Sequence, residues 1–212
     1  GELNPARGAL FWFGKVTPSV NSADVRMAYN GAKLTVVLHV IDRLIWYDPG
    51  ANTGRDLTQY DGATLYLHTA DSQGPGDATY RFDAQVNSWE DRANYQRAYR
   101  YNNGAWTPAS IAFSTASGFR GSINDGLDSR GSTLRFDIPF SSLGQSGAPN
   151  QGAIWRMAIA LHDRDSQNGA ANPDQLWPVG VDVAQAATWG RLAFGLPNYQ
   201  APTVAQRKTL VL

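Results

Sequence analysis

Apolar and polar residues alternate with a period of two in at least six segments of this chain, as they do in half-buried β-strands. Clear examples are residues 25–29, 63–68, 80–84, 133–138 and 156–162, and further strands are predicted at 96–101, as part of a hairpin, and around 189–194. No long segment shows the 3.6-residue period of an amphipathic helix. The pattern predicts a protein built almost entirely of β-strands.

The most apolar of the predicted strands is Lys33–Asp42. One face carries Leu34, Val36, Leu38 and Val40, and the other carries Thr35, Val37, His39 and Ile41. Because both faces are largely apolar, we expect this strand to be covered on both sides. Asn30-Gly31 lies just before it and predicts a tight hairpin, because both residues tolerate positive φ.

Turn signals between the strands suggest how the chain is organised. Asn102-Asn103-Gly104 predicts another hairpin, and Ser88 followed by Asp91 predicts one short helical turn. Residues 197–212 contain Pro197 and Pro202 with little alternation, so a linker or a wrapped C-terminal tail is expected after a domain of residues 1–196.

We therefore predict a single all-β domain, an antiparallel β-sandwich of two sheets with a jelly-roll-like or immunoglobulin-like arrangement. Its predicted core consists of Leu34, Val36, Leu38, Leu65, Leu67, Phe136, Ile159 and Leu161.

Composition narrows the classes of partner. The chain has 212 residues, a formal net charge of zero and no cysteine. It has no basic run interleaved with aromatics and no apolar run of the roughly 20 residues that a membrane span needs, so neither a nucleic acid nor a membrane is expected as a partner. The cysteine-free composition is compatible with secretion.

The order of the motifs resembles carbohydrate-binding module family 9 and the related DOMON-type sandwiches. The resemblance rests on AYNGAKLTVVLHVID, YDGATLYLHT, YRFDA, RFDIPFSSLG, WRMAIALHDRD and WGRLAFG, which together span roughly residues 10 to 196. It implies a calcium-supported sandwich that binds sugar, often between two tryptophans. Arg81 matches the arginine of the family's Tyr-Arg motif. Three positions depart from the pattern, with Thr58 near the first tryptophan position, Thr64 at an acidic position and Asp83 at a usual asparagine position.

Aromatic residues in predicted loops are the first candidates for binding sugar, since an exposed ring buries the apolar face of a sugar at little ordering cost. They are Trp46, Tyr47, Tyr60 and Trp177, although such rings can equally close the ends of a sandwich. Trp12, Trp155 and Trp189 lie in or near strands, and we expect them in the core.

Polar residues on two neighbouring strands form the second candidate. Thr64, Tyr66 and His68 alternate on one strand, and Arg81 and Asp83 on the next. They can hydrogen-bond sugar hydroxyls, or simply form cross-strand pairs on an exposed face.

A calcium site is predicted near Asp163, Asp165 and Asn168, because oxygen ligands recur there before a glycine; the alternative is a solvated turn. Asp42, Asp48 and Asp61 are further candidates. The calcium is expected to be structural, and no organic cofactor is expected. No nucleophile, phosphate-binding or zinc-binding motif is present, so we do not expect an enzyme.

The expected function is therefore that of a non-catalytic module that binds a polysaccharide or oligosaccharide. We expect it to be a monomeric part of a secreted, multidomain bacterial protein. Two alternatives remain open. One is a haem-binding DOMON-type domain with axial ligands from Met27, Met157, His39, His68 or His162. The other is a purely structural spacer in a larger secreted enzyme.

Overall fold

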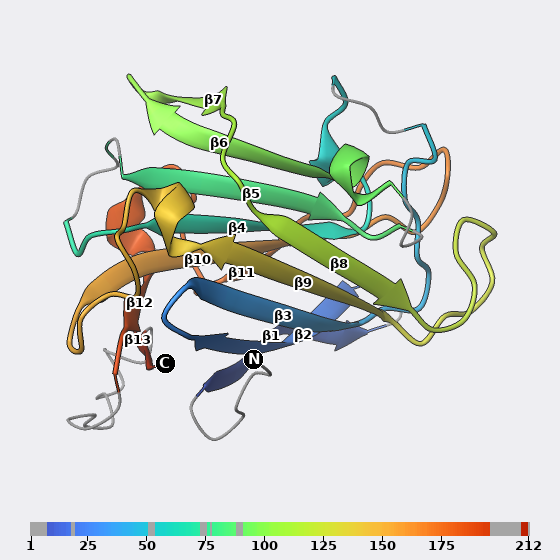
Figure 1. Cartoon of the computed structure of the whole chain (residues 1–212). Coiled ribbons are helices and arrows are strands. Elements are labelled where there is room, and N and C mark those ends of the chain that lie inside the picture. Colours follow the sequence, from blue (N-terminus) through green and yellow to red (C-terminus); the bar gives the residue numbers. More distant parts are fainter. Residues whose placement is uncertain are drawn as a thin grey trace.

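The computed structural model describes residues 8–17, 20–50, 54–72, 76, 78–87, 91–195 and 209–211. The chain forms two β-sheets packed face to face (Figure 1). Sheet A has the strand order β1-β2-β3-β9-β8, and sheet B has the order β13-β12-β10-β4-β5-β6-β7, with β11 also paired to β10. The predicted all-β sandwich is confirmed.

The strands of sheet A are β1 (Ala9–Thr17), β2 (Val20–Tyr29), β3 (Lys33–Ile41), β8 (Ser114–Phe119) and β9 (Ser132–Pro139). Those of sheet B are β4 (Gly62–His68), β5 (Thr79–Gln85), β6 (Gln96–Asn102), β7 (Ala105–Pro108), β10 (Ile154–His162), β11 (Gln175–Trp177), β12 (Gly190–Ala193) and β13 (Thr209–Val211). Neighbouring strands pair antiparallel except β12 and β13, which pair parallel.

Helical structure in the described residues is limited to the short 3-10 turns η2 (Leu57–Gln59), η3 (Arg92–Tyr95), η4 (Phe140–Leu143) and η5 (Ala186–Thr188). None of the helices in this part of the chain has the length and apolar character needed to cross a membrane.

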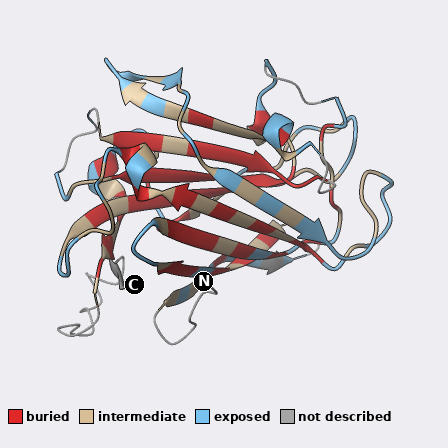
Figure 2. Cartoon of the chain, in the orientation of Figure 1, coloured by how far each residue is buried: buried red, intermediate tan, exposed pale blue. Residues whose placement is uncertain are grey.

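The hydrophobic core lies between the two sheets, where alternate side chains of each strand meet. All eight residues predicted for the core are buried there. Figure 2 shows the result along the strands, with β4 and β5 buried over almost their whole length and β8 largely exposed or half-buried.

The two predicted hairpins are both present, but they close differently. Asn103 and Gly104 between β6 and β7 take positive φ, as expected. The turn between β2 and β3 instead uses the Asn30 side chain, whose Oδ1 accepts from the backbone N–H groups of Ala32 (2.8 Å) and Lys33 (2.9 Å). Because this Asx-type turn holds the chain, neither residue of Asn30-Gly31 needs positive φ.

Four strands lie where the alternation gave no clear signal, namely β1, β8, β11 and β13. The predicted helical start at Ser88 falls on residues outside the described part of the chain, whereas η3 follows it directly after Asp91. Residues 197–208 of the predicted tail also lie outside it, while Thr209–Val211 pairs with β12 as β13.

The outer faces of the two sheets differ in their covering. Tyr66, Ala158 and Ala160 on sheet B lie in a second apolar cluster with Val181, Ala186 and Trp189. Trp155 and Trp189 are buried as expected.

The outer face of sheet A is open, and this corrects two expectations. On this face of β3, Thr35 is buried and Val37 half-buried, but His39 and Ile41 are exposed, so the expected cover on both sides is wrong for the end of the strand. Trp12 is 74% exposed and does not belong to the core. Apolar residue type alone did not reveal the side of the strand that faces solvent.

Candidate functional site

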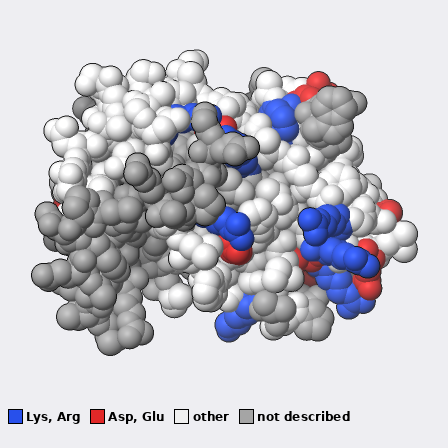
Figure 3. Space-filling model, turned by 60° about the horizontal axis from the view of Figure 1, so that its bottom comes forward, with Lys and Arg blue, Asp and Glu red and all other residues white. Residues whose placement is uncertain are grey.

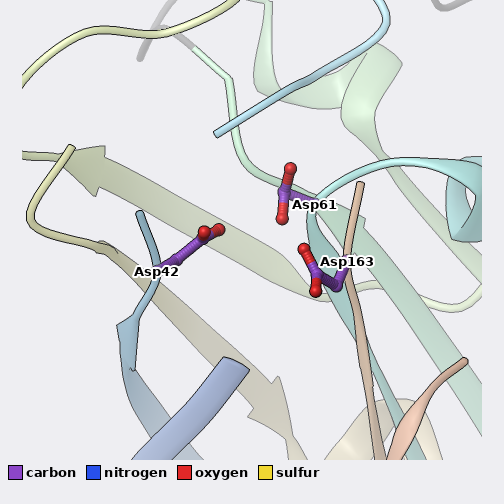
Figure 4. Close-up of side chains that lie close together, drawn as sticks. All are labelled: Asp42, Asp61 and Asp163. Carbon is purple, nitrogen blue, oxygen red and sulfur yellow. The ribbon is translucent and has the colours of Figure 1, made fainter. Parts of the chain in front are cut away.

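Three buried aspartates meet at one end of the sandwich. Asp42 follows β3, Asp61 precedes β4 and Asp163 follows β10, so the ends of both sheets contribute. One carboxylate oxygen from each lies within 4.8 Å of the others. Figure 4 shows the three side chains converging from separate strands. Each aspartate was a candidate ligand on sequence grounds. Because they are far apart along the chain, the sequence did not predict that they share one site.

Backbone and amide donors fix the three carboxylates in place. The N–H of Leu44 donates to Asp42 Oδ1 at 2.9 Å, and the N–H of Trp46 donates to Asp61 Oδ2 at 2.7 Å. The Nδ2 of Asn172 donates to Asp163 Oδ2 and to Asp165 Oδ2, both at 2.9 Å. Asn172, which the sequence did not single out, therefore joins Asp165 to the cluster.

The cluster lacks compensation for its negative charge. Asp61 Oδ1 and Asp163 Oδ1 are buried without a hydrogen-bond partner, and within the described residues no ion pair involves any of the three carboxylates. Unpaired charge in a protein interior is costly. These carboxylates therefore need either protons or a cation.

Burial raises the pKa of all three acids. The pKa of Asp61 lies well above its usual value because of burial and the nearby charge of Asp42. The pKa of Asp42 is raised chiefly by burial, and that of Asp163 is raised to about 7 by burial and by the neighbouring aspartates.

This arrangement predicts an unusual pH dependence when the protein is free of metal. An acid with a raised folded-state pKa binds more protons in the folded than in the unfolded state between the two pKa values, so its contribution to stability is lost as the pH rises. In EDTA, we expect the Tm of the wild-type protein to be higher at about pH 6 than at about pH 8. We expect this rise in Tm from pH 8 to pH 6 to be smaller in Asp163→Asn. His68, whose pKa is lowered by burial, acts in the opposite direction, so the difference between the two proteins is the informative quantity. An equal rise in both would contradict the assignment.

The donor set suits a hard divalent cation. Calcium prefers six to eight oxygen ligands, and carboxylates supply both charge and oxygens. The unpaired oxygens of Asp61 and Asp163, together with Asp42, fit such an ion.

The predicted loop ligands divide between this cluster and a separate turn. Asp163 is in the cluster and Asp165 is linked to it, but Asn168 is exposed. The guanidinium of Arg164 donates to the carbonyls of Ser166 (2.9 Å), Gln167 (3.3 Å) and Gly169, so it occupies the acceptors of that turn. Asp48 pairs with Arg55 instead (2.5 Å).

A polar network lies on the outer face of sheet B. Arg81 donates twice to Asp83, from Nε at 2.8 Å and from its terminal nitrogen at 2.7 Å, and its guanidinium lies 4.8 Å from the centre of the Tyr99 ring. The Thr64 hydroxyl donates to Asp83 Oδ1 at 2.7 Å. Asp83 is fully buried, so Arg81 and Thr64 hold its charge in place.

His162 extends this network toward solvent. Its Nε2 lies 2.8 Å from the Thr64 hydroxyl and its Nδ1 lies 2.8 Å from Asp174 Oδ1. The order of groups is that of a hydroxyl–histidine–carboxylate triad. Thr64 is fully buried, however, and its hydroxyl is held by Asp83, so the contacts give it no role as a nucleophile. The sequence analysis considered His162 only as a candidate haem ligand and did not single out Asp174, so neither was expected in a sugar site.

The predicted aromatic residues are not gathered in one place. Trp46 and Tyr47 are half-buried in the loop after Asp42, where Tyr47 contacts Tyr95 edge to face. Tyr60 lies beneath the Arg164 guanidinium, 4.5 Å from it. Trp177 is only 8% exposed and packs against Phe11 (ring centres 4.7 Å apart), so it offers little ring surface to a ligand.

Tyr66 belongs to the wall of the polar network. Its ring contacts Trp106 and Trp189, and burial raises its pKa to about 12. Asp56 at the start of η2 lies on the same side. Its pKa is lowered despite partial burial because Thr58 and Gln59 donate hydrogen bonds to it and Arg81 adds an attractive charge.

The candidate haem ligands do not face one another. Met27 and Met157 are buried in the core between the sheets. His39 lies on the outer face of sheet A, and His68 and His162 lie on the outer face of sheet B. Since the methionines and histidines project to opposite sides of their strands, this arrangement disfavours an axial Met–His pair.

Comparison with known proteins relates the fold to one class of solved structure. No known family profile and no curated protein sequence matches the chain. A family 9 carbohydrate-binding module from Caldicellulosiruptor kristjanssonii in complex with cellotriose is 13% identical, with a TM-score of 0.61 over 96% of this chain and 92% of that one. A structure of such a module from the same organism in complex with glucose is 15% identical, with a TM-score of 0.57 over 95% and 93%.

A candidate carbohydrate-binding protein from Bacteroides uniformis is 16% identical, with a TM-score of 0.62 over 88% of this chain and 87% of that one. At these identities the likeness concerns the fold. The chain thus has the fold of family 9 carbohydrate-binding modules, as the order of its motifs suggested.

Proposed function

We propose that this chain is a non-catalytic carbohydrate-binding module that holds its ligand on the outer face of sheet B, over Arg81. The observation that carries the proposal is the connected network of Arg81, Asp83, Thr64, His162 and Asp174. The similarity of the fold to modules solved with cellotriose and with glucose supports it.

The network has the chemistry that sugar hydroxyls require, since each hydroxyl both donates and accepts. Arg81 supplies N–H donors, and its orientation is fixed by two bonds to Asp83. Asp174, with 42% of its side chain exposed, supplies an acceptor at the surface. Tyr99 and Trp106 border the same face and offer ring surface for the apolar side of a sugar.

The residues first considered contribute unequally to this proposal. Tyr66 and Asp83 support the network from beneath, because both are buried. Trp46, Tyr47 and Tyr60 are proposed as accessory contacts at the end of the sandwich, whereas the burial of Trp177 argues for packing. A glucose-based oligosaccharide is the first ligand to test, since two structural relatives were solved in complex with cellotriose and with glucose.

We also propose that calcium binds Asp42, Asp61 and Asp163 and serves a structural role. Its two charges would offset those of the buried carboxylates and would tie the ends of β3, β4 and β10 together. As a further part of the proposal, the module acts as a monomeric part of a secreted, multidomain bacterial protein, without nucleic acid or membrane partners.

Calorimetric titration with cellotriose tests the sugar site. We expect Arg81→Gln and Asp174→Ala each to weaken binding about tenfold or more, because each removes a charged hydrogen-bonding group. Asp174 is partly exposed, so Asp174→Ala should fold. Arg81→Gln retains an amide that can donate to Asp83 but loses the positive charge opposite that buried carboxylate, so its thermal unfolding is measured first and the titration is run well below its Tm.

Arg100→Gln is the matched control. Arg100 lies on neighbouring β6 opposite Tyr80, and Arg81 lies opposite Tyr99, so the two arginines project to different faces of sheet B. Wild-type affinity in both site variants would contradict the proposed position. Absence of binding across a panel of neutral glycans would favour the structural-spacer alternative.

A further inference from the structure

The outer face of sheet A presents an exposed row of chemically mixed side chains. Strand register places Trp12 beside Asp24, Asp24 beside His39, His39 beside Thr133 and Thr133 beside Gly118. The row takes one residue from each of the five strands and therefore extends about 19 Å across the sheet. Trp12 lies at one end with 74% of its surface exposed.

A groove of about 480 Å³ follows this row away from Trp12. Asp24, His39 and Thr133 of the row line it, and so does Ile41, which is 58% exposed. Gly118 carries no side chain to fill the space above its strand. The result is a depression lined by hydrogen-bonding groups and by the apolar side chain of Ile41, beside a row that crosses all five strands, which suits an extended ligand.

Two arginines add positive charge to the lining of the groove. Arg120 and Arg130 both line it, and in the described part of the chain neither side chain forms an ion pair or hydrogen bond. The backbone N–H of Arg130 donates to the carbonyl of Arg120 at 2.7 Å, so the two arginine side chains extend from neighbouring backbone positions.

The acidic residue of the groove does not cancel this charge. Asp24 is paired with Arg26 at 3.3 Å, which leaves the two arginines as an excess of positive charge. Figure 3 brings the lower side of Figure 1 forward and shows Lys and Arg side chains gathered at the right, with Asp and Glu side chains among them. The two guanidinium groups of the groove, unpaired within the described residues, complement an anionic ligand.

We propose that this groove is a second ligand site and that it binds an acidic polysaccharide whose sugars carry carboxylates. The polysaccharide lies across the strands of sheet A. One sugar ring stacks on Trp12, hydroxyl groups bond to His39 and Thr133, and carboxylates pair with Arg120 and Arg130. Arginine suits this role because its planar fork matches a carboxylate. The site lies on the opposite sheet from Arg81 and does not rest on the function proposed there.

Titration with polygalacturonate, against the same polymer fully methyl-esterified, tests this site. We expect measurable binding of the acid form, weakened about tenfold or more in Trp12→Ala and in the double variant Arg120→Ala/Arg130→Ala. Binding of the acid form should also weaken with added salt, and the neutral ester should bind about tenfold less tightly or not at all.

Leu10→Ala and Arg100→Ala are the controls, since Leu10 is exposed on the same face of β1 and Arg100 lies on the other sheet. Arg81→Gln should leave polygalacturonate binding unchanged, which separates this site from the one proposed above. The proposal is overturned by an absence of binding, by full binding in Trp12→Ala, or by equal affinity for single-stranded DNA. The last result would show a general attraction for polyanions.

Discussion

Removal of divalent cations with EDTA is expected to lower the Tm of this protein by roughly 5–10 °C relative to the calcium-saturated form. A ligand present at about 100 times its dissociation constant stabilises the folded state by about 2.7 kcal/mol, and 1 kcal/mol corresponds to about 2–4 °C in a domain of this size. The physical reason is the cluster of Asp42, Asp61 and Asp163, whose buried charges repel one another and have no basic partner in the described residues.

Differential scanning calorimetry of two variants makes this test specific. Asp61→Asn removes a carboxyl group whose pKa is raised by burial and by the charge of Asp42, and with it one proposed ligand of the cation. We expect Asp61→Asn to lose the response to calcium, and exposed Asp125→Asn to retain it. Magnesium should stabilise less, because it gives up its water reluctantly. An unchanged Tm in EDTA, or a calcium response that survives in Asp61→Asn, would show that no ion is held there.

Replacement of Arg81 by alanine is expected to destabilise the fold by about 3–5 kcal/mol, as the loss of one partner of a buried ion pair generally does. Asp83 is fully buried, and after the substitution only the Thr64 hydroxyl would remain among its present partners. The cost arises from the uncompensated carboxylate and not from the lost contact itself.

A double-mutant cycle measured by urea unfolding separates these two contributions. Arg81→Ala/Asp83→Asn has no buried charge at this position, so we expect it to recover much of the stability lost in Arg81→Ala. The m-value should stay constant if only stability changes. A loss below about 1 kcal/mol in Arg81→Ala would mean that solvent already screens the pair.

Much of the fold was predictable because its strongest determinant, period-two alternation, is local. Leu65 and Leu67 on β4, and Ile159 and Leu161 on β10, stand two positions apart and face the core as predicted. Strands without that pattern were missed. β8 contains Ser114, Ala116 and Gly118 on its outer side and presents little apolar contrast.

The side of a strand that meets solvent was harder to predict, as Trp12 and Ile41 show. Both are apolar, both lie in strands and both are exposed, because no element of the described chain covers the outer face of sheet A there. Whether an apolar face is covered depends on the path of distant segments, which alternation within a strand does not encode.

The candidate sites were predictable as residue types but not as constellations. Asp163 was expected to bind calcium through its own loop, yet it meets Asp42 and Asp61, which lie more than 100 residues earlier. His162 and Asp174 lie in one network with Arg81 and Asp83 only because β4 pairs with both β5 and β10. Such meetings follow from tertiary topology, so chain spacing cannot reveal them.

A crystal structure of the protein with cellotriose is the most direct test of the central claim, that the outer face of sheet B binds sugar. We predict a sugar ring over the network, with hydroxyl groups in hydrogen-bonding distance of Arg81 and Asp174 and a ring face against Tyr99 or Trp106. Electron density for the sugar at Trp46 and Tyr47, with the surface above Arg81 occupied by water alone, would contradict it.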